Sequence, residues 1–195
     1  MHPRSGYDAD VAEDGDADAL REAMKKVAVE LKRADIQFAL AGGYAAFARG
    51  GPESDHDVDF YLREEDVQSA EKALDKAGLR VEYPPEDWLV KVYDGDAMVD
   101  LIHSPTDLKV TAEMLDRADD IQVDSVEMPV LSATDLMLSK LLALTEHYCD
   151  FASLFPVVRA LREQLDWPRL GQETAGNPYA QAFLSLVAEL GLTCQ

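Results

Sequence analysis

The sequence has little cysteine and few basic residues, and each shortage excludes a class of protein. Its two cysteines, Cys149 and Cys194, are too few for a disulfide framework, so a reducing cytoplasm is expected. Only 18 Lys and Arg stand against 38 Asp and Glu, which gives a formal net charge of −20. That charge argues against duplex DNA, bulk RNA and anionic membrane surfaces as partners.

Long apolar runs are also missing. No segment approaches the uninterrupted length of about 20 apolar residues that spans a bilayer. The N-terminus has no basic region followed by an apolar stretch, so no secretory signal is expected. These absences predict a cytoplasmic protein without a membrane partner. A local basic path to a nucleic-acid end stays open, because Lys25, Lys26, Lys32 and Arg33 cluster on the first expected helix.

Hydrophobic residues make up 47% of the 195 residues, enough for one full core. Residues 1–16 are acidic with almost no large apolar side chain, which predicts a disordered tail. Leu20, Met24, Val27 and Leu31 then recur at helical spacing and predict an amphipathic helix.

The middle of the chain is typical of short strands separated by turns and helices. The expected elements are a strand at 36–40, a short helix at 44–48, a strand carrying Asp57 and Asp59, a helix at 64–77, a strand at 79–82, a hairpin over 88–103 and a weaker hairpin over 121–131. The first hairpin rests on Asp94-Gly95 between two apolar runs. The pattern predicts an α+β protein with a mixed sheet.

The remainder of the chain is predicted to be helical. Ser132 to Asp135 form a capping box that opens a helix running to about residue 146. Ser153 is expected to cap the next helix, with Pro156 in its first turn. A helical region should therefore pack behind the sheet.

Asp57 and Asp59 are the residues that speak most directly to function. Alternate side chains of a strand share a face, so the two carboxylates should project together while Val58 points the other way. They repel each other and lose solvation when covered, and a divalent cation removes both penalties. The nearby Gly42-Gly43 turn can offer backbone N–H groups to phosphate oxygens. Together these residues predict a site for a metal–triphosphate complex.

Each feature has a simpler interpretation when taken alone. The glycine pair fits a strand-to-helix turn that needs positive φ, and the two aspartates fit the polar face of a surface strand. Asp100 interrupts the apolar run 97–102, where a buried carboxylate is costly unless it is paired or metal-bound; at a strand end it would simply be exposed. Because the hairpin can bring Asp100 beside Asp57 and Asp59, a three-carboxylate cluster is favoured.

These motifs resemble the signature of the nucleotidyltransferase fold of the polymerase-beta type. The resemblance rests on Gly42-Gly43, Asp57-Val58-Asp59 and the apolar-flanked Asp100, and it covers roughly residues 20–167. Residues 40–49 are also similar to the start of small aminoglycoside nucleotidyltransferases. Residues 131–144 look like the helix after the sheet in toxin-type members of abortive-infection and toxin–antitoxin systems.

The resemblance implies a mixed, partly antiparallel sheet flanked by helices, with a nucleotidyltransferase core at 17–131 and a helical region at 132–195 packed on it. It implies a transferase that moves a nucleoside monophosphate from an NTP to an acceptor hydroxyl and releases pyrophosphate. The catalytic and metal-binding residues would be Asp57, Asp59 and Asp100, the nucleotide-binding residues Gly42, Gly43 and Lys140, and the metal Mg²⁺, with Mn²⁺ as the alternative.

Two departures limit the detail that the resemblance carries. The superfamily often has Gly-Ser where this chain has Gly43, so a hydroxyl that can touch phosphate is missing. Toxin-type members commonly carry an Arg-Asp pair after the helix lysine, where this chain has His147-Tyr148-Cys149-Asp150. Lys140 alone would fit an outward-facing lysine. The roles of His147, Asp150 and Arg49 stay open between substrate contacts and structure.

The expected partners are an NTP and an acceptor that is a small molecule or a specific RNA end. One alternative is a toxin-type enzyme that acts on tRNA or protein and has an antitoxin as its partner. The other is a non-catalytic nucleotide-binding module of the same fold, against which the intact acid triad argues.

Overall fold

The computed structural model describes residues 7–54, 57–105 and 108–193 of the protein. Its strands are β1 (Phe38–Ala41), β2 (Val58–Leu62), β3 (Arg80–Glu82), β4 (Leu89–Asp94), β5 (Ala97–Ile102), β6 (Asp119–Val123) and β7 (Val126–Val130). Its helices are α1 (Tyr7–Arg33), α2 (Gly42–Ala48), η1 (Glu64–Asp66), α3 (Val67–Lys76), α4 (Ala112–Asp116), α5 (Ala133–Leu142), α6 (Phe151–Leu161), α7 (Trp167–Glu173) and α8 (Pro178–Glu189).

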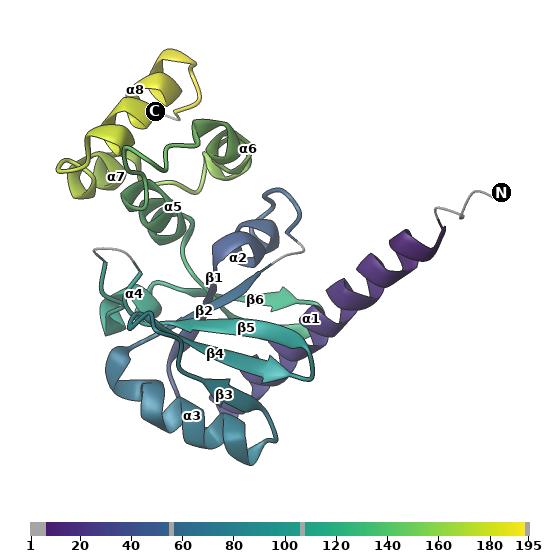
Figure 1. Ribbon diagram of the computed structural model, residues 1–195. Coiled ribbons are helices and arrows are strands. Elements are labelled where there is room, and N and C mark those ends of the chain that lie inside the picture. Colours follow the sequence, from purple (N-terminus) through teal and green to yellow (C-terminus); the bar gives the residue numbers. More distant parts are fainter. Residues whose placement is uncertain (1–6, 55–56, 106–107, 194–195) are drawn as a thin grey trace.

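The strands form one sheet in the order β3-β4-β5-β2-β1-β7-β6 (Figure 1). Neighbouring pairs are antiparallel, except that β2 runs parallel to β5 and β1 runs parallel to β7. This mixed sheet, with helices against it, confirms the predicted α+β fold. The parallel pairing of β2 with β5 brings together two strands that lie far apart in the sequence.

One face of the sheet is covered by α1 and α3; in Figure 1 α3 lies below the sheet and α1 runs behind it. Met24, Val27 and Leu31 of α1 are fully buried there, as their helical spacing predicts. On the same face of the sheet Phe38 of β1 and Phe60 of β2 meet edge to face, with ring centroids 5.4 Å apart. This face is therefore the main hydrophobic core, and it fixes which strand residues point away from it.

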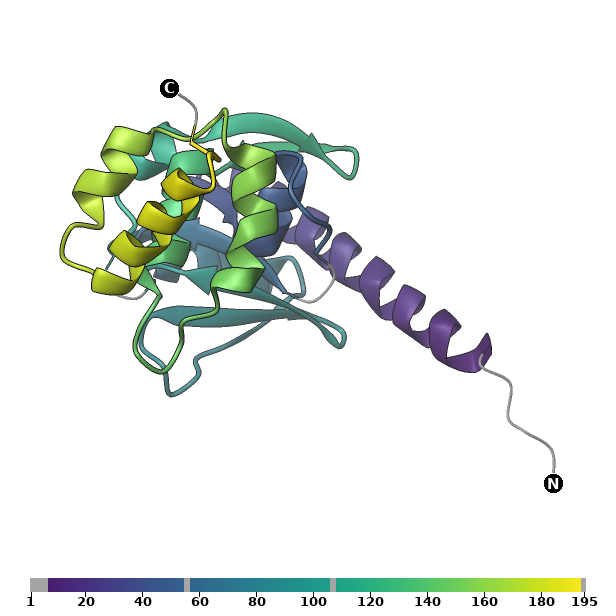
Figure 2. The same cartoon turned by 90° about the horizontal axis from the view of Figure 1, so that it is seen from above.

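The opposite face carries α2 and α5, with α6, α7 and α8 stacked beyond them (Figures 1 and 2). The predicted cap of α5 is confirmed, because the Ser132 side chain accepts a hydrogen bond from the backbone N–H of Asp135. The helix ends at Leu142, earlier than the residue 146 expected from the sequence. None of the described helices is long and apolar enough to cross a membrane.

Both predicted hairpins are present. β4 and β5 pair antiparallel up to Asp94 opposite Ala97, with Gly95 at φ +63° in the turn between them. The β6–β7 turn holds Asp124 and Ser125 at φ +44° and +71°, the left-handed geometry of a tight hairpin turn. Turn chemistry thus sets the register of both hairpins.

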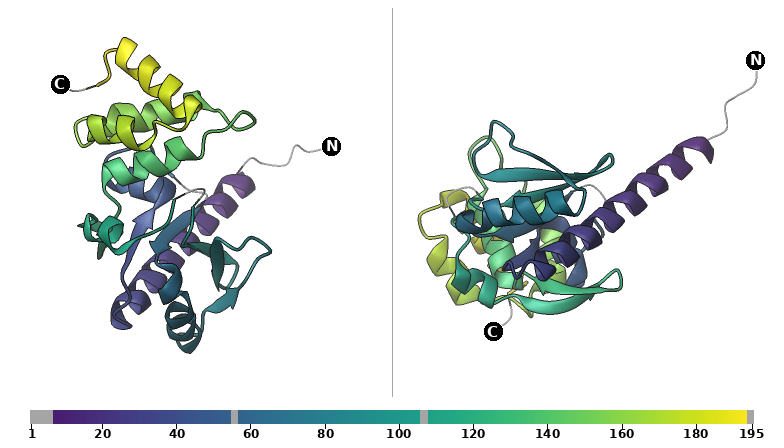
Figure 3. Two further views of the ribbon diagram at one scale, coloured as in Figure 1. Left: turned by 90° about the vertical axis from the view of Figure 1, so that its left-hand side faces the viewer. Right: turned by 90° about the horizontal axis from the view of Figure 1, so that it is seen from below.

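Two further boundaries differ from the sequence prediction. α1 begins at Tyr7, within the segment expected to be a tail, and its N-terminal half extends beyond the sheet (Figure 3). Residues 1–6 of that segment lie outside the described residues. The prediction that Ser153 caps the next helix is wrong. The cap of α6 is Asp150, whose carboxylate accepts from the backbone N–H groups of Ala152 and Ser153.

Candidate active site

A row of charged side chains crosses three strands on the face that carries α2 and α5. In the parallel pairing of β2 with β5, Asp59 lies directly opposite Asp100. In the antiparallel pairing of β4 with β5, Lys91 lies opposite Asp100. Directly paired residues share a face of the sheet, so Asp59, Asp100 and Lys91 stand side by side. We call these three residues the charged row.

The Gly42-Gly43 turn approaches neighbouring side chains so closely that neither glycine has room for a side chain of its own. Gly42 adopts φ +62°, and a Cβ there would overlap the Asp59 carboxylate. A Cβ on Gly43 would overlap the Ser54 hydroxyl. Ala41, just before the turn, is the β1 partner of Asp59. The turn thus holds the Asp59 carboxylate closely against the backbone where β1 passes into α2.

Asp59 is surrounded by the residues that the sequence analysis singled out. Burial raises the pKa of Asp59 to about 6, and the negative charges of Asp100 and Asp57 act in the same direction. Lys140 and Lys91 lower it in part. Burial also lowers the pKa of Lys140, and Asp59 opposes that shift. The two aspartates and the lysine that the resemblance implied therefore act on Asp59 as near neighbours.

Lys91 is the member of the row that the sequence analysis missed. Its Nζ lies 3.1 Å from Asp100 Oδ1 and 3.2 Å from Met98 Sδ. Counting outward from the Asp94-Gly95 turn of the predicted hairpin places residue 91 opposite residue 100, so the signal was present in the sequence. The ion pair compensates part of the charge of a half-buried carboxylate.

Lys140 acts on the row from α5. Tyr61, two residues after Asp59 on β2, has its hydroxyl near that of Ser139, the residue before Lys140. Burial raises the pKa of the Tyr61 hydroxyl to about 12. This proximity brings the lysine end of α5 to the strand that carries Asp59.

A buried carboxylate on α5 anchors the same helix at its other end. Asp135 is fully buried and receives hydrogen bonds from Arg117 (2.9 and 2.8 Å), Arg169 (2.6 Å) and the Ser132 hydroxyl (2.6 Å). Burial alone would raise the pKa of Asp135, but these donors together lower it. Arg117 follows α4 and Arg169 lies on α7, so the cluster joins three helices.

Arg49, His147 and Asp150 do not join the row. The Arg49 side chain is only 7% exposed; it donates to the carbonyls of Leu131 (2.5 Å) and Val130 (3.0 Å) and pairs with Asp119 (2.7 Å). These contacts tie α2 to β6 and β7. Asp150 caps α6, and His147 is exposed in the loop between α5 and α6. Arg49 and Asp150 thus have structural roles.

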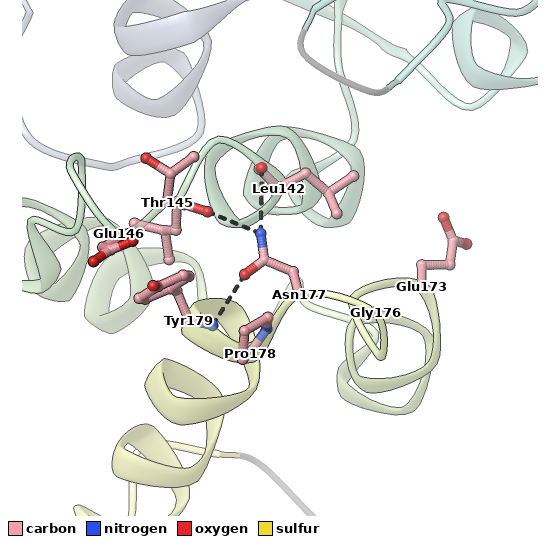
Figure 4. Close-up of a pocket in the computed structure, with 9 residues that line it drawn as sticks. Leu142, Thr145, Glu146, Glu173, Gly176, Asn177, Pro178 and Tyr179 are labelled. Atoms are coloured by element: carbon pink, nitrogen blue, oxygen red, sulfur yellow. Dashed lines mark hydrogen bonds between the residues drawn. The ribbon is translucent and has the colours of Figure 1, made fainter.

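A separate hollow of about 570 Å³ lies between the end of α5 and the start of α8 (Figure 4). Asn177 spans it: its side-chain N–H₂ donates to the carbonyls of Leu142 (3.4 Å) and Leu144 (3.0 Å), and its side-chain oxygen accepts from the Tyr179 N–H at 3.0 Å. Glu146 and Glu173 also line it. No residue of the charged row lines this hollow, so we assign it no part in catalysis.

The donor chemistry of the carboxylates suits a hard divalent cation. Carboxylate oxygens are the ligands that Mg²⁺ prefers, and the repulsion that raises the Asp59 pKa is what a bound cation relieves. Within residues 7–54, 57–105 and 108–193, no three His, Cys, Asp or Glu side chains are already placed to hold one ion. Asp57 is exposed just before β2, so binding would require its side chain to turn toward Asp59.

The sequence matches the model of one known protein family. The family described as "Uncharacterised nucleotidyltransferase" matches residues 12–195. The chain belongs to this family. It is therefore an enzyme of the nucleotidyltransferase class, which transfers nucleoside monophosphates. No curated protein matches the sequence of this nucleotidyltransferase.

The solved structures similar to this chain include those of antibiotic nucleotidyltransferases. The solution structure of the antibiotic-resistance factor ANT(2″)-Ia is 18% identical, with a TM-score of 0.51 over 88% of this chain and 92% of that chain. The crystal structure of ANT(2″)-Ia in complex with adenylyl-2″-tobramycin is 20% identical, with a TM-score of 0.49 over 85% of this chain and 88% of that chain. The lincomycin-bound lincosamide antibiotic adenylyltransferase LnuA is 12% identical, with a TM-score of 0.46 over 65% of this chain and 87% of that chain. The similarity to the solution structure supports the predicted nucleotidyltransferase fold and no more.

Proposed function

We propose that this nucleotidyltransferase moves a nucleoside monophosphate from an NTP to a hydroxyl group of a small-molecule acceptor, with Mg²⁺ held by Asp57, Asp59 and Asp100. The observation that supports it is the pairing of Asp59 with Asp100 on neighbouring strands, beneath Lys140. Two half-buried carboxylates side by side are costly for the fold on its own and useful for holding a cation. Mn²⁺ has the same preference for oxygen ligands and is the expected substitute.

Each residue has a distinct task in this proposal. Asp57 and Asp59 hold the metal-bound triphosphate, and the Gly42-Gly43 backbone steadies its phosphates. When bound, the cation supplies charge neutralisation at the phosphates and brings the attacking oxygen into line. Asp100 faces the acceptor and accepts the proton of its hydroxyl. Lys140 compensates the remaining negative charge of the triphosphate.

The surface charges favour a small acceptor over a nucleic acid. The basic cluster on α1 was the one local path to an RNA end that the sequence left open, and in the structure its members are engaged within the protein. Lys25 pairs with Glu22 (2.5 Å), Lys26 with Asp94 (2.8 Å) and Arg33 with Glu30 (2.6 Å), and Lys32 donates to the Glu127 carbonyl (2.6 Å). Against a net charge of −20, a neutral or cationic acceptor is the better electrostatic match.

The acceptor can be identified by following label from the NTP. Each of the four NTPs, labelled at the α-phosphate, is incubated with Mg²⁺ and with separate pools of aminoglycosides, tRNA and cellular protein. We expect label in the small-molecule pool, and none in any pool when EDTA is present. Labelled tRNA or protein would contradict the small-molecule assignment and favour a toxin-type enzyme. No label in any pool, with NTP still bound, would favour a non-catalytic module.

Nucleotide binding should depend on the metal. NTP is expected to raise the melting temperature when Mg²⁺ is present and to leave it unchanged in EDTA, because the carboxylates repel a bare triphosphate. A ligand that binds only the folded state stabilises it by about 2.7 kcal/mol at a hundredfold excess over its dissociation constant. Thermal melts with four mixtures (no addition, Mg²⁺, NTP, and both) give the answer. Equal shifts with and without metal would refute a carboxylate-held cation.

A further inference from the structure

Two side-chain oxygens flank the backbone of the Gly42-Gly43 turn. The Asp59 carboxylate occupies the space that a Cβ on Gly42 would need, and the Ser54 hydroxyl and Cβ occupy the space that a Cβ on Gly43 would need. Consecutive glycines thus bring Ser54 next to the same short stretch of chain as Asp59. Ser54 comes from the segment between α2 and β2 and is not a strand residue.

The Ser54 hydroxyl is available to a ligand. Ser54 is half-buried, and no hydrogen bond between described residues uses its hydroxyl. A hydroxyl held against a backbone turn, partly covered and without a described protein acceptor, can donate to a bound group at little cost in side-chain entropy.

The chemistry around it selects the kind of group. Asp59 and Asp100 repel an anion, so any phosphate beside them needs donors as well as a cation. Besides Lys91, which is paired with Asp100, the donors near Asp59 among the described residues include the Lys140 ammonium, the backbone of the glycine turn and the Ser54 hydroxyl. A hydroxyl is neutral, so it can donate to a phosphate oxygen without forming an ion pair with the neighbouring carboxylate.

We propose that Ser54 is a nucleotide-binding residue whose hydroxyl donates a hydrogen bond to a phosphate oxygen of the NTP from the position where a residue-43 side chain would stand. The inference rests on the proposed function, since it takes the NTP as the ligand. It adds a residue that Gly43 cannot replace, because position 43 carries no side chain in this chain. Ser54 acts on binding and takes no proton from the acceptor.

Moving the hydroxyl from position 54 to position 43 tests the proposal. Gly43 does not have a positive φ, so it tolerates a side chain once position 54 is cleared. The variants are Ser54→Ala, the exchange variant Gly43→Ser with Ser54→Gly, and its control Gly43→Ala with Ser54→Gly. The exchange variant and its control differ by one hydroxyl. Calorimetry with a non-hydrolysable NTP and Mg²⁺ gives the dissociation constant of each, and nucleoside alone serves as the ligand without phosphates.

We expect Ser54→Ala to weaken NTP binding by about tenfold to a hundredfold, the range for a lost hydrogen bond to a charged group, and to leave nucleoside binding unchanged. The exchange variant should recover most of the affinity and its control should not. Wild-type affinity in Ser54→Ala, or equal affinity in the exchange variant and its control, would overturn the inference alone. A wild-type protein that binds no NTP with Mg²⁺ would overturn the proposed function as well. Melting curves of each variant establish that it is folded.

Discussion

Replacing Asp59 by Asn is expected to abolish nucleotide transfer while making the metal-free protein more stable at neutral pH. Burial of Asp59, together with repulsion from Asp100 and Asp57, raises its pKa to about 6. In the proposed function Asp59 holds the cation that stabilises the transferred phosphate, so its loss should lower the transfer rate by about a thousandfold. The same change removes a charge that the fold opposes, so activity and stability should move in opposite directions.

The gain in stability should depend on pH with a definite sign. Because the folded-state pKa of Asp59 lies above its unfolded value of 3.8, its contribution to stability is fully present below about pH 4 and is lost as pH rises through about 6. Asn does not titrate, so the Asp59→Asn variant keeps its stability over that window. A shift of about two pKa units corresponds to about 3 kcal/mol, which partial solvent exposure reduces to about 1–2 kcal/mol at pH 7.

Thermal melts in EDTA at pH 4, 5, 6 and 7 measure this difference, and labelled NTP measures transfer. Glu86→Gln, which removes an exposed carboxylate, is the control and should change neither quantity. Asp100→Asn should impair turnover more than nucleotide binding, and should stabilise less than Asp59→Asn because it deprives Lys91 of its partner. Transfer at the wild-type rate in both aspartate variants would show that the charged row is not the active site. Unfolding of both at pH 7 would show that the row is structural.

The sequence was informative where local rules decide the structure. Alternation along the strand separated Asp59 from the buried Val58, and the Asp94-Gly95 turn fixed the hairpin that carries Asp100. The pairing of β2 with β5 then set Asp59 opposite Asp100, as the sequence analysis favoured from the hairpin and as the resemblance to nucleotidyltransferases implied. The same alternation placed Asp57 within the strand. In the structure Asp57 lies just before β2 and is exposed.

Several of the contacts that sequence reasoning missed join segments that are distant in the sequence. The Arg49 side chain donates to the carbonyls of Val130, at the end of β7, and of Leu131, the residue after it. Both lie more than 80 residues away in the sequence, so these contacts could be found only once the order of the strands was known. Ser54 lies beside Gly43 through a turn that no composition rule predicts. The sequence analysis predicted that Asp135 belongs to a capping box, which is correct for its backbone N–H. It did not predict the two arginines that bind the Asp135 carboxylate: Arg117, which follows α4, and Arg169, which lies on α7. Such partners depend on packing, which the spacing of residues within one helix does not determine.

Asp135→Ala is expected to destabilise the protein by about 3 kcal/mol, because removing one partner of a buried ion pair costs about 3–5 kcal/mol when the remaining charges are left uncompensated. The lower end applies, since the Arg117 side chain is 41% exposed and the Arg169 side chain 23% exposed, so water can solvate both in part. Urea unfolding at pH 7 measures the change. Glu163→Ala is the control, since it breaks an exposed pair with Arg162 worth about 0–1 kcal/mol.

The pH dependence of Asp135→Ala distinguishes lost charge pairing from lost packing. Because the folded-state pKa of Asp135 is lowered, its contribution is present above the unfolded pKa and is lost as pH falls below it toward the folded value. Wild-type protein and Asp135→Ala should therefore differ most at neutral pH and converge as the solution is acidified below about pH 4. Asp135→Asn keeps the size of the side chain and part of its hydrogen bonding. Its stability at neutral pH should therefore lie between that of the wild-type protein and that of Asp135→Ala. A constant difference at every pH would mean that the arginines contribute nothing through charge, and that α5 is held over the charged row by packing alone.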